Sequence, residues 1–493
     1  MTEKNLPQVD LANYNLDSTV LSLVPASIAE KYNLIPIFKT GKILTIAMSD
    51  PKNILALDEV RGSSHMDLSI VVSDARQIKE AIAEYYGISG IVEDVVKNYK
   101  PAGSVKVEKH DKEEAPIVKL FNVILLQALR ERASDIHIEP EHDKVRVRFR
   151  VDGVLHEEVG MPTYMHAPIV SRVKVLSKMD IAESRIPQDG RFEINDEERA
   201  IDFRVSTFPS AFGEKVVIRI LDKNSMLYTL PDIGFSEKNL KIFRELAHKP
   251  HGIILITGPT GSGKSSTLYA TLLEINNKEI NIMTVEDPIE YELDGITQSQ
   301  VNTKAGLTFA SALRSILRQD PDVILVGEIR DSETAEIAIQ SSLTGHLVFS
   351  TLHTNDSAGA VVRLVDMNIE PFLIASSLEG VMAQRLVRTI CKKCKTIVDA
   401  PDEFKEKYNL DKMVKAQGCK ACNGTGYKGR TGIFELLVID EELRKMISNR
   451  ASADDIRKYS MAHGTKSLFE DGLDKVRAQV TTLDEVLRVA ELD

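Results

Sequence analysis

The chain lacks tryptophan, only 5% of its 493 residues are aromatic, and its formal net charge is −11. Proteins that track a nucleic-acid strand present basic grooves and aromatic side chains on which bases stack. We therefore expect no nucleic-acid partner, although a local basic patch could lie within the acidic total. A nucleic-acid translocase is kept as a remote alternative.

Long apolar runs are also missing. No stretch reaches the roughly 18 uncharged apolar residues that indicate a membrane-spanning helix. The first residues, MTEKNLPQVDLANYN, contain no apolar core of a secretory signal. We therefore expect a cytoplasmic protein that reaches a membrane only through partners.

Cysteine is scarce as well, and all four cysteines fall within one segment. CKKC at 391–394 and CKAC at 419–422 are two C-x-x-C pairs. In a reducing compartment such a cluster favours a metal over disulfides, and two pairs together can form a tetrahedral zinc site. We expect the Zn²⁺ to be structural, because four thiolates leave no coordination position open for catalysis. The predicted ligands are Cys391, Cys394, Cys419 and Cys422.

The rest of the chain predicts an α/β protein of several domains. Strands that alternate in polarity, such as KVRVRFRVDG, indicate one sheet. Apolar strands separated by helices, such as GIILIT and DVILV, indicate a parallel sheet covered on both faces. The expected parts are a small α/β domain at 1–88, a linker at 89–115, a middle domain at 116–232, a third domain at 236–390, a zinc-binding subdomain at 391–435 and a C-terminal helical region at 436–493.

GPTGSGKSS at 258–266 follows the apolar stretch HGIILIT and opens a helical segment. It fits G-x-x-x-x-G-K-[ST], the loop whose backbone N–H groups wrap the phosphates of a nucleotide. In this pattern Lys264 reaches the β- and γ-phosphates of ATP and Ser265 binds Mg²⁺. The expected nucleotide-binding residues are Gly258, Pro259, Thr260, Gly261, Ser262, Gly263, Lys264, Ser265 and Ser266.

Acidic residues end two further apolar strands. VILVGE ends in Glu328, a carboxylate that can hold Mg²⁺ or its water from the neighbouring strand. TVEDPIE places Glu286, Asp287 and Glu290 at another strand end, and one of them, Glu286 first, can polarise the attacking water. The sequence leaves the reverse assignment of the two glutamates open. TGHLVFSTLHT adds His353 as a catalytic candidate, although a single histidine is often structural.

These motifs, together with LRSILRQDPDVILVGEIRDSETAEIAIQ and QRLVRTICKKC, closely resemble the secretion ATPase superfamily of type II secretion and type IV pili, the PulE/PilB-like proteins. The resemblance covers about residues 115–440. It implies a RecA-like P-loop core and a PAS-like α+β middle domain, with ATP bound between these two domains. It also implies that the chain forms a homo-hexamer. It also implies arginines that reach the γ-phosphate, at positions Arg204, Arg219, Arg314 and Arg318.

Within the superfamily, GHLVFSTLHTNDSAGAVVRLVDMNIEPF is most similar to the type II secretion ATPases. The resemblance implies a motor that assembles a pilin-like filament for protein export, with type IV pilus extension as the alternative. The C-x-x-C insertion is typical of members that assemble filaments. The implied partners are a GspL-like inner-membrane protein, docked on the N-terminal domain, and a GspF-like platform protein. Some relatives bind cyclic di-GMP through an Arg-Leu-Gly motif, which is absent near this N-terminus.

Overall fold

The computed structural model describes residues 6–11, 18–21, 23–85, 116–196, 199–222 and 228–490. The linker that we expect at 89–115 lies outside these residues. The chain divides into two compact units, Met1–Lys223 and Asn224–Asp493. Among the described residues, no helix combines the length and the apolar content that crossing a membrane requires.

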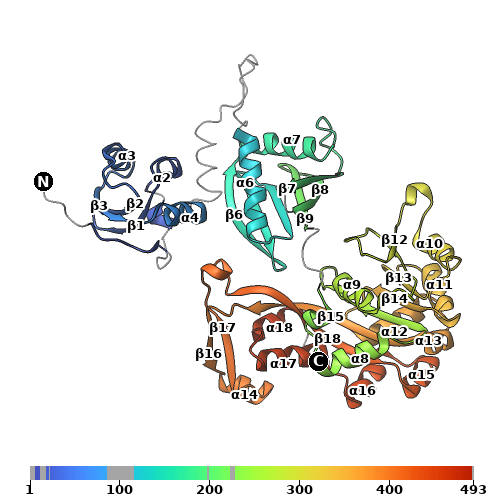
Figure 1. The fold of residues 1–493 in the computed structure, drawn as a ribbon. Helices are drawn as coiled ribbons and strands as arrows, with labels where there is room; N and C mark the ends of the chain where they lie inside the picture. The colour runs from blue at the N-terminus through green and yellow to red at the C-terminus, as the bar shows by residue number, and fades with distance from the viewer. Residues whose placement is uncertain are drawn as a thin grey trace. The chain divides into compact units, whose positions relative to one another are not determined.

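The N-terminal part of the first unit is a three-stranded sheet with helices (Figure 1). Strands β1 and β2 form an antiparallel hairpin that turns at Gly41, and β3 joins β2 in parallel through a helical crossover. Apolar side chains of the strands are buried in two clusters, so the expected small α/β domain is confirmed. Its elements are α1 (Ser18–Leu21), α2 (Ala26–Tyr32), β1 (Leu34–Thr40), β2 (Ile43–Met48), α3 (Ile54–Ser64), β3 (Asp67–Val72) and α4 (Ala75–Tyr85).

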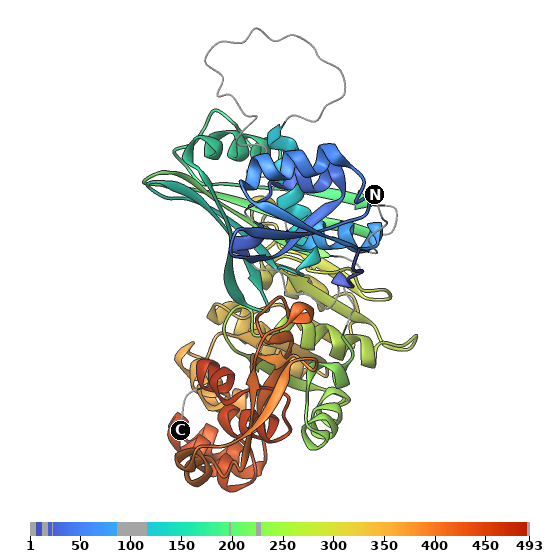
Figure 2. The same cartoon turned by 90° about the vertical axis from the view of Figure 1, so that its left-hand side faces the viewer.

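The middle domain is a six-stranded antiparallel sheet in the order β6-β5-β4-β9-β8-β7, seen from the side in Figure 2. Alternation explains its two faces: Val145, Val147 and Phe149 of β5 are buried in an apolar core shared with α6 and α7. The arginines between them lie on the opposite, polar face. The elements are α6 (Pro116–Arg130), β4 (Asp135–Pro140), β5 (Lys144–Val151), β6 (Val154–Pro162), α7 (His166–Leu176), β7 (Gln188–Asp196), β8 (Arg199–Ser210) and β9 (Gly213–Asp222).

The second unit is built on a seven-stranded sheet in the order β12-β11-β13-β14-β10-β15-β18. All neighbouring pairs are parallel except β15 with β18. One apolar cluster joins the sheet to α8 and α9, and another joins it to α10–α13, so both faces are covered as expected. The elements are α8 (Glu237–Ala247), β10 (Gly252–Thr257), α9 (Lys264–Ile275), β11 (Ile282–Glu286), β12 (Thr297–Gln300), α10 (Phe309–Ile316), β13 (Val323–Val326), α11 (Ser332–Leu343), β14 (Leu347–Leu352), α12 (Ser357–Asp366), α13 (Pro371–Ser377) and β15 (Leu378–Ile390).

In the C-terminal part, the expected boundary at residue 435 between the zinc-binding subdomain and the helical region does not separate two structural parts. Strand β18 begins inside the segment expected to be the zinc-binding subdomain, yet it belongs to the main sheet. Helices α17 and α18 share an apolar core with β15, β18 and the zinc segment, because apolar residues such as Ile433 and Leu483 are buried together. The elements are β16 (Lys395–Asp399), α14 (Asp402–Tyr408), β17 (Lys412–Ala416), β18 (Tyr427–Val438), α15 (Glu441–Ser448), α16 (Ala453–Ala462), α17 (Leu468–Arg477) and α18 (Leu483–Val489).

The end of the middle domain, expected at residue 232, also differs. Leu230 and Ile233 are buried in the core of the second unit. Gly234 has φ 103°, and a Cβ at this position would lie 2.0 Å from Thr431 Oγ1. Phe235 stacks on Phe434 with ring centroids 4.2 Å apart. The turn at PDIGF is therefore packed into the second unit.

Candidate active site

The phosphate loop follows β10, a strand whose residues are all buried. Gly258, Gly261 and Gly263 have φ values of 150°, 80° and 88°, a region that residues with a side chain rarely adopt. A Cβ on Gly258 would lie 2.6 Å from the carbonyl oxygen of Gln384. Glycine is therefore required for the sharp turn and for the close approach of two backbones.

Helix α9 begins directly at Lys264, and its N-cap residue, Gly263, provides no side-chain cap. The first N–H groups of a helix lack intrahelical acceptors, and the helix dipole favours an anion at this end. Ser265 is exposed in the same first turn. The uncapped donors and the exposed hydroxyl fit the phosphates and the Mg²⁺ of a bound nucleotide.

The Lys264 side chain folds back over the loop. Its ammonium donates hydrogen bonds to the carbonyl oxygens of Gly258, at 2.8 Å, and Pro259, at 3.1 Å. Burial lowers the pKa of Lys264; the Glu328 carboxylate opposes this shift and the positive charge of Arg385 adds to it. The ammonium thus lies at the loop with only carbonyl partners, and Glu328 is close enough to act on its charge.

Three successive strands of the sheet end at this loop. In the order β13-β14-β10, Glu328 follows β13, His353 follows β14 and the phosphate loop follows β10. Because the strands are parallel, their carboxyl ends meet at one edge of the sheet, where ligands of such folds bind. Glu328 therefore does not come from the neighbouring strand, as the sequence suggested, but from the next one, since β14 lies between.

Glu328 is held by a guanidinium group and an imidazole ring. Arg330 forms an ion pair with one carboxylate oxygen, and His353 Nε2 lies 3.0 Å from the other. Burial alone would raise the pKa of Glu328, but the hydrogen bonds and charges of Arg330 and His353 outweigh it and lower the pKa below its ordinary value. The carboxylate is therefore ionised at neutral pH.

Glu286, the last residue of β11, lies in a different environment. It is buried, and Tyr269 donates a hydrogen bond to one carboxylate oxygen. The other oxygen accepts from Thr284 Oγ1, at 2.6 Å, and from Gln298 Nε2, at 3.1 Å. Both oxygens are thus engaged inside the domain. This arrangement does not favour the expected role of Glu286 beside an attacking water.

The four predicted arginines occur as two pairs in separate units. Arg314 and Arg318 lie together at the end of α10, where Arg314 pairs with Glu333 at 2.7 Å and Arg318 donates to the Arg314 carbonyl. Arg204 and Arg219 lie directly opposite each other on β8 and β9 of the middle domain. They line a cavity of about 530 Å³ on its polar face.

Two residues of the site were missed by reasoning from sequence. Arg385 is buried beside Gly258 and donates to the Asn355 carbonyl at 2.8 Å. Gln384 accepts a hydrogen bond from Thr267 of α9 at 2.9 Å. Together they connect the phosphate loop to the segment that follows His353. The available signal was their occurrence as adjacent polar residues inside the apolar stretch GVMAQRLVRTI.

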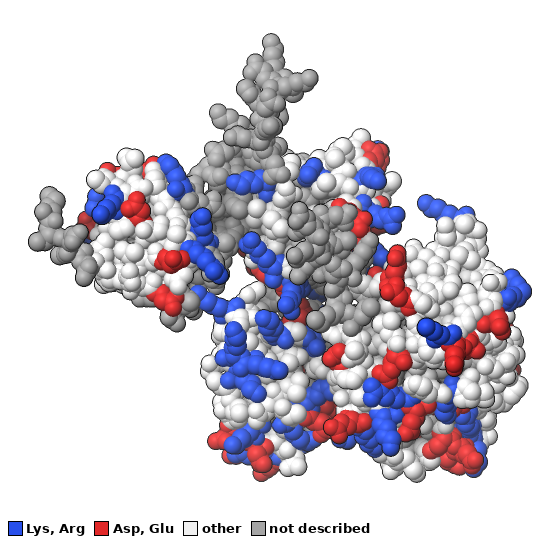
Figure 3. Space-filling model, in the orientation of Figure 1, with Lys and Arg blue, Asp and Glu red and all other residues white. Residues whose placement is uncertain are grey.

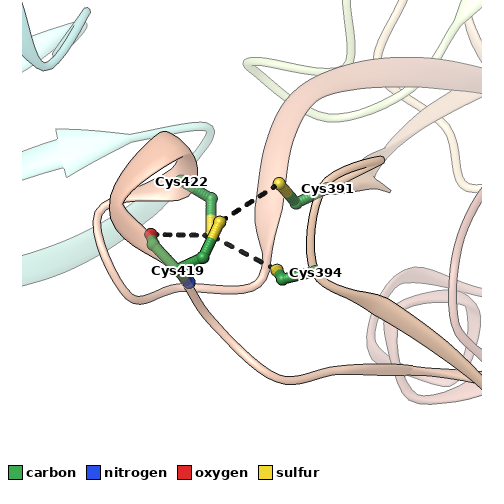
Figure 4. Close-up of side chains that lie close together, drawn as sticks. All are labelled: Cys391, Cys394, Cys419 and Cys422. Carbon is green, nitrogen blue, oxygen red and sulfur yellow. Dashed lines mark hydrogen bonds between the residues drawn. The ribbon is translucent and has the colours of Figure 1, made fainter. Parts of the chain in front are cut away.

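The four cysteines converge from two turns, and their side chains point toward one another (Figure 4). The sulfurs of Cys391 and Cys419 are 3.9 Å apart, and those of Cys394 and Cys422 are 3.7 Å apart. A tetrahedral zinc ion about 2.3 Å from each sulfur would place the sulfurs about 3.8 Å apart. Backbone N–H groups of Cys419 and Gly426 also donate to the Cys422 sulfur. The geometry therefore fits the expected Cys₄ site.

Substituting one thiol of each pair, Cys394→Ser with Cys419→Ser, should abolish zinc binding. We expect about one zinc ion per wild-type chain and none in the variant, because two thiolates cannot complete a tetrahedral site. Local opening around β16 and β17 should follow, since the metal ties this segment together. Zinc content and limited proteolysis measure both effects. A zinc-free wild-type protein as protease-resistant as a zinc-loaded sample would contradict the prediction.

A local basic patch does exist in this acidic chain. Figure 3 shows lysine and arginine side chains gathered over the surface that β16 and β17 form. No aromatic side chain in residues 391–435, all of which the structure describes, is exposed. The patch therefore lacks the stacking platform of a protein that binds single-stranded nucleic acid. Its exposed lysines are Lys392, Lys393, Lys395, Lys412, Lys415 and Lys420.

A phosphate loop, a carboxylate and a histidine at the carboxyl edge of a parallel sheet define a P-loop ATPase. Residues 110–488 match the family described as Type II/IV secretion system protein, and residues 5–91 match the MshEN domain. The match spans most of the chain. The chain therefore belongs to the type II/IV secretion system protein family.

Individual relatives agree with this assignment. The chain is 52% identical to the type II secretion system ATPase E of Vibrio cholerae over 425 residues, which are 85% of this chain and 83% of the relative. It is 42% identical to the type IV pilus assembly ATPase PilB of Myxococcus xanthus over 502 residues, 98% of this chain and 88% of the relative. The structure of the pilus retraction motor PilT with bound ADP matches with a TM-score of 0.51 and 25% identity, over 75% of this chain and 96% of that chain.

Proposed function

We propose that the chain is a cytoplasmic, hexameric ATPase that hydrolyses ATP to assemble a pilin-like filament for protein export by type II secretion. The observation that carries the proposal is the convergence of the phosphate loop, His353 and Glu328 at the ends of three successive parallel strands. The 52% identity to a type II secretion ATPase supports the export role over other uses of such a motor.

The residues of the loop fit a nucleotide. The uncapped N–H groups of α9 and the Lys264 ammonium would hold the phosphates, and the Ser265 hydroxyl and Glu328 would hold Mg²⁺. Bound Mg²⁺ supplies a Lewis acid that neutralises charge on the transferring phosphoryl group. In this arrangement Lys264 exchanges its two carbonyl partners for phosphate oxygens.

Glu328 is the glutamate that we place at the reacting phosphate. Its charge acts on Lys264, and His353 and Arg330 fix its carboxylate. We assign Glu286 a positioning role: through Tyr269 it connects the strand β11 to the phosphate-loop helix α9. His353 orients Glu328 through the 3.0 Å contact and carries no separate chemical step.

The arginines supply charge from outside the loop. Arg204, Arg219, Arg314 and Arg318 would neutralise the equatorial oxygens of the γ-phosphate, where charge spreads in the transition state. Arg219 and Arg314 are more than half exposed and are thus accessible to a nucleotide held by a neighbouring copy. In a hexameric ring, the arginines of each copy would meet the nucleotide of the neighbouring copy at every subunit interface.

Two kinds of partner follow from this function. We propose that the N-terminal domain docks on the cytoplasmic part of a GspL-like inner-membrane protein. Movement driven by ATP would act on a GspF-like platform protein. Through these two partners, and not directly, the chain would reach the inner membrane. Zn²⁺ at the Cys₄ site would hold the C-terminal segment rigid.

Type IV pilus extension is the second candidate. It is favoured by the match to the pilus assembly ATPase, which spans 98% of the chain and includes the N-terminal domain. A nucleic-acid translocase is a remote alternative, because the basic patch over β16 and β17 lacks exposed aromatic residues.

Deleting the gene in the source cell separates the first two candidates. We expect the loss of exported enzymes from the medium with pili intact, and recovery of export when the wild-type chain is supplied again. Loss of pili with normal export would move the chain to pilus extension and leave the ATPase chemistry unchanged.

A further inference from the structure

A row of charged side chains crosses the polar face of the middle-domain sheet. On five neighbouring strands, one residue of each strand lies directly opposite one residue of the next strand. The side chains of these five residues therefore lie on the same face of the sheet. The row contains four guanidinium groups and one carboxylate. Like charges placed directly opposite each other are destabilising, and such a row therefore favours bound anions. Its members are Arg191, Arg204, Arg219, Asp135 and Arg150, in spatial order.

The carboxylate of this row is fixed from three sides. Asp135 is 7% exposed, and one of its oxygens accepts a hydrogen bond from Arg219 Nε at 3.2 Å. The other oxygen accepts from Ser134 Oγ at 2.8 Å and lies 3.6 Å from Arg150 Nε. Asp135 is thus a buried anion built into the sheet beside the arginines.

Arg219 differs from its carboxylate partner in its exposure to solvent. Its side chain is 56% exposed, and it lines the 530 Å³ cavity together with Arg204 and Arg191. The anchored partner is Asp135, and the partner that can leave is Arg219. A phosphate entering the cavity offers the same guanidinium several oxygens and more negative charge than one carboxylate.

We propose that Asp135 is an internal stand-in for a phosphate group. It holds Arg219 along the row while no nucleotide is present, and it yields Arg219 when the phosphates of ATP arrive. This inference rests on the proposed role of Arg219 at the γ-phosphate. It adds a regulatory residue, because the carboxylate and the phosphate compete for one cation and thereby set the apparent affinity for ATP.

The test is Asp135→Asn in the full-length chain, which removes the competing charge and keeps the shape. The KM for ATP should fall roughly two- to fivefold, the range expected for releasing one partly exposed ion pair. The kcat should stay within about twofold, because Arg219 itself is retained. An unchanged or raised KM would overturn the proposal.

The matched control is Asp189→Asn, which removes the same charge from the same cavity. The structure gives Asp135, but not Asp189, a hydrogen bond from Arg219. The KM should therefore respond to Asp135→Asn and much less to Asp189→Asn. Equal falls in KM for the two variants would show that only the electrostatic potential of the cavity matters, and would overturn the role of the Asp135–Arg219 pair.

Two further variants fix the mechanism. In an Arg219→Ala background, Asp135→Asn should no longer change the KM, because the two residues act as one pair. If Asp135→Asn fails to fold, Arg150→Ala replaces it: Asp135 then loses its second cation, binds Arg219 more tightly, and the KM should rise. A KM unchanged by Arg150→Ala would overturn the proposal. Normal turnover in Arg219→Ala would instead remove the proposed function of Arg219 itself.

Discussion

Lys264→Ala should abolish ATP turnover and leave the chain folded. In the structure the Lys264 ammonium lies on the phosphate loop with two carbonyl partners, at 2.8 and 3.1 Å. Removing one preorganised charge from the site where phosphoryl charge develops costs about a hundredfold or more in kcat. Stability should hardly change, because alanine is a good helix former at the first position of α9.

Phosphate release and thermal melting of the purified chain measure both parts of this prediction. Lys278→Ala is the matched control, since Lys278 is exposed on the same domain just beyond the end of α9. Turnover by Lys264→Ala near the level of the control would contradict the role of the loop. A large fall in melting temperature would show that the lysine is structural.

Glu328→Gln and Glu286→Gln should fail in different ways. The Glu328 carboxylate is ionised at neutral pH, so glutamine removes a full charge beside Lys264. We expect kcat to fall by about a hundredfold or more while ATP still binds. The melting temperature should change little, because the glutamine oxygen can still accept a hydrogen bond from His353.

Glu286→Gln should instead lower stability. Both Glu286 oxygens accept hydrogen bonds from buried donors. In the glutamine variant, the NH₂ group would replace one of these oxygens, so that two donors would face each other and neither would have an acceptor. An unsatisfied buried group of this kind costs about 1–3 kcal/mol. Melting temperature and kcat, measured on both variants, separate the two cases. A stable Glu286→Gln chain with the larger loss of kcat would reverse our assignment of the glutamates.

Much of the fold could be predicted from sequence because local patterns carry it. Alternation in KVRVRFRV predicts a sheet with one buried face, and continuous apolar strands such as GIILIT predict one buried on both faces. The phosphate loop was readable because its glycines and lysine are adjacent in sequence. The cysteine cluster was readable for the same reason, since each C-x-x-C pair forms one turn.

Features that depend on distant residues could not be predicted. The sequence around β18 does not indicate that this strand pairs with β15 on the other side of the zinc segment. The boundaries of the zinc-binding subdomain, expected at residues 390 and 435, could therefore not be found from sequence. The packing of Phe235 on Phe434 joins residues 199 positions apart, which hides where the second unit begins. The order of strands decides whether Glu328 is next to the loop or one strand away, and sequence does not contain that order.

Site roles show the same limit. Glu286 looks as accessible as Glu328 in sequence, because both end an apolar strand. Only the packing of α9 against β11 brings the Tyr269 hydroxyl to the Glu286 carboxylate. The partner of Arg219 is likewise set by the pairing of β4 with β9, which brings together Asp135 and Arg219, 84 positions apart in sequence.

The most direct measurement is complementation of the deletion strain with Lys264→Ala at wild-type expression. The account predicts normal amounts of the chain, no exported enzyme in the medium and no ATP turnover by the purified variant. Restoration of export by this variant would contradict the claim that ATP hydrolysis at this phosphate loop drives secretion.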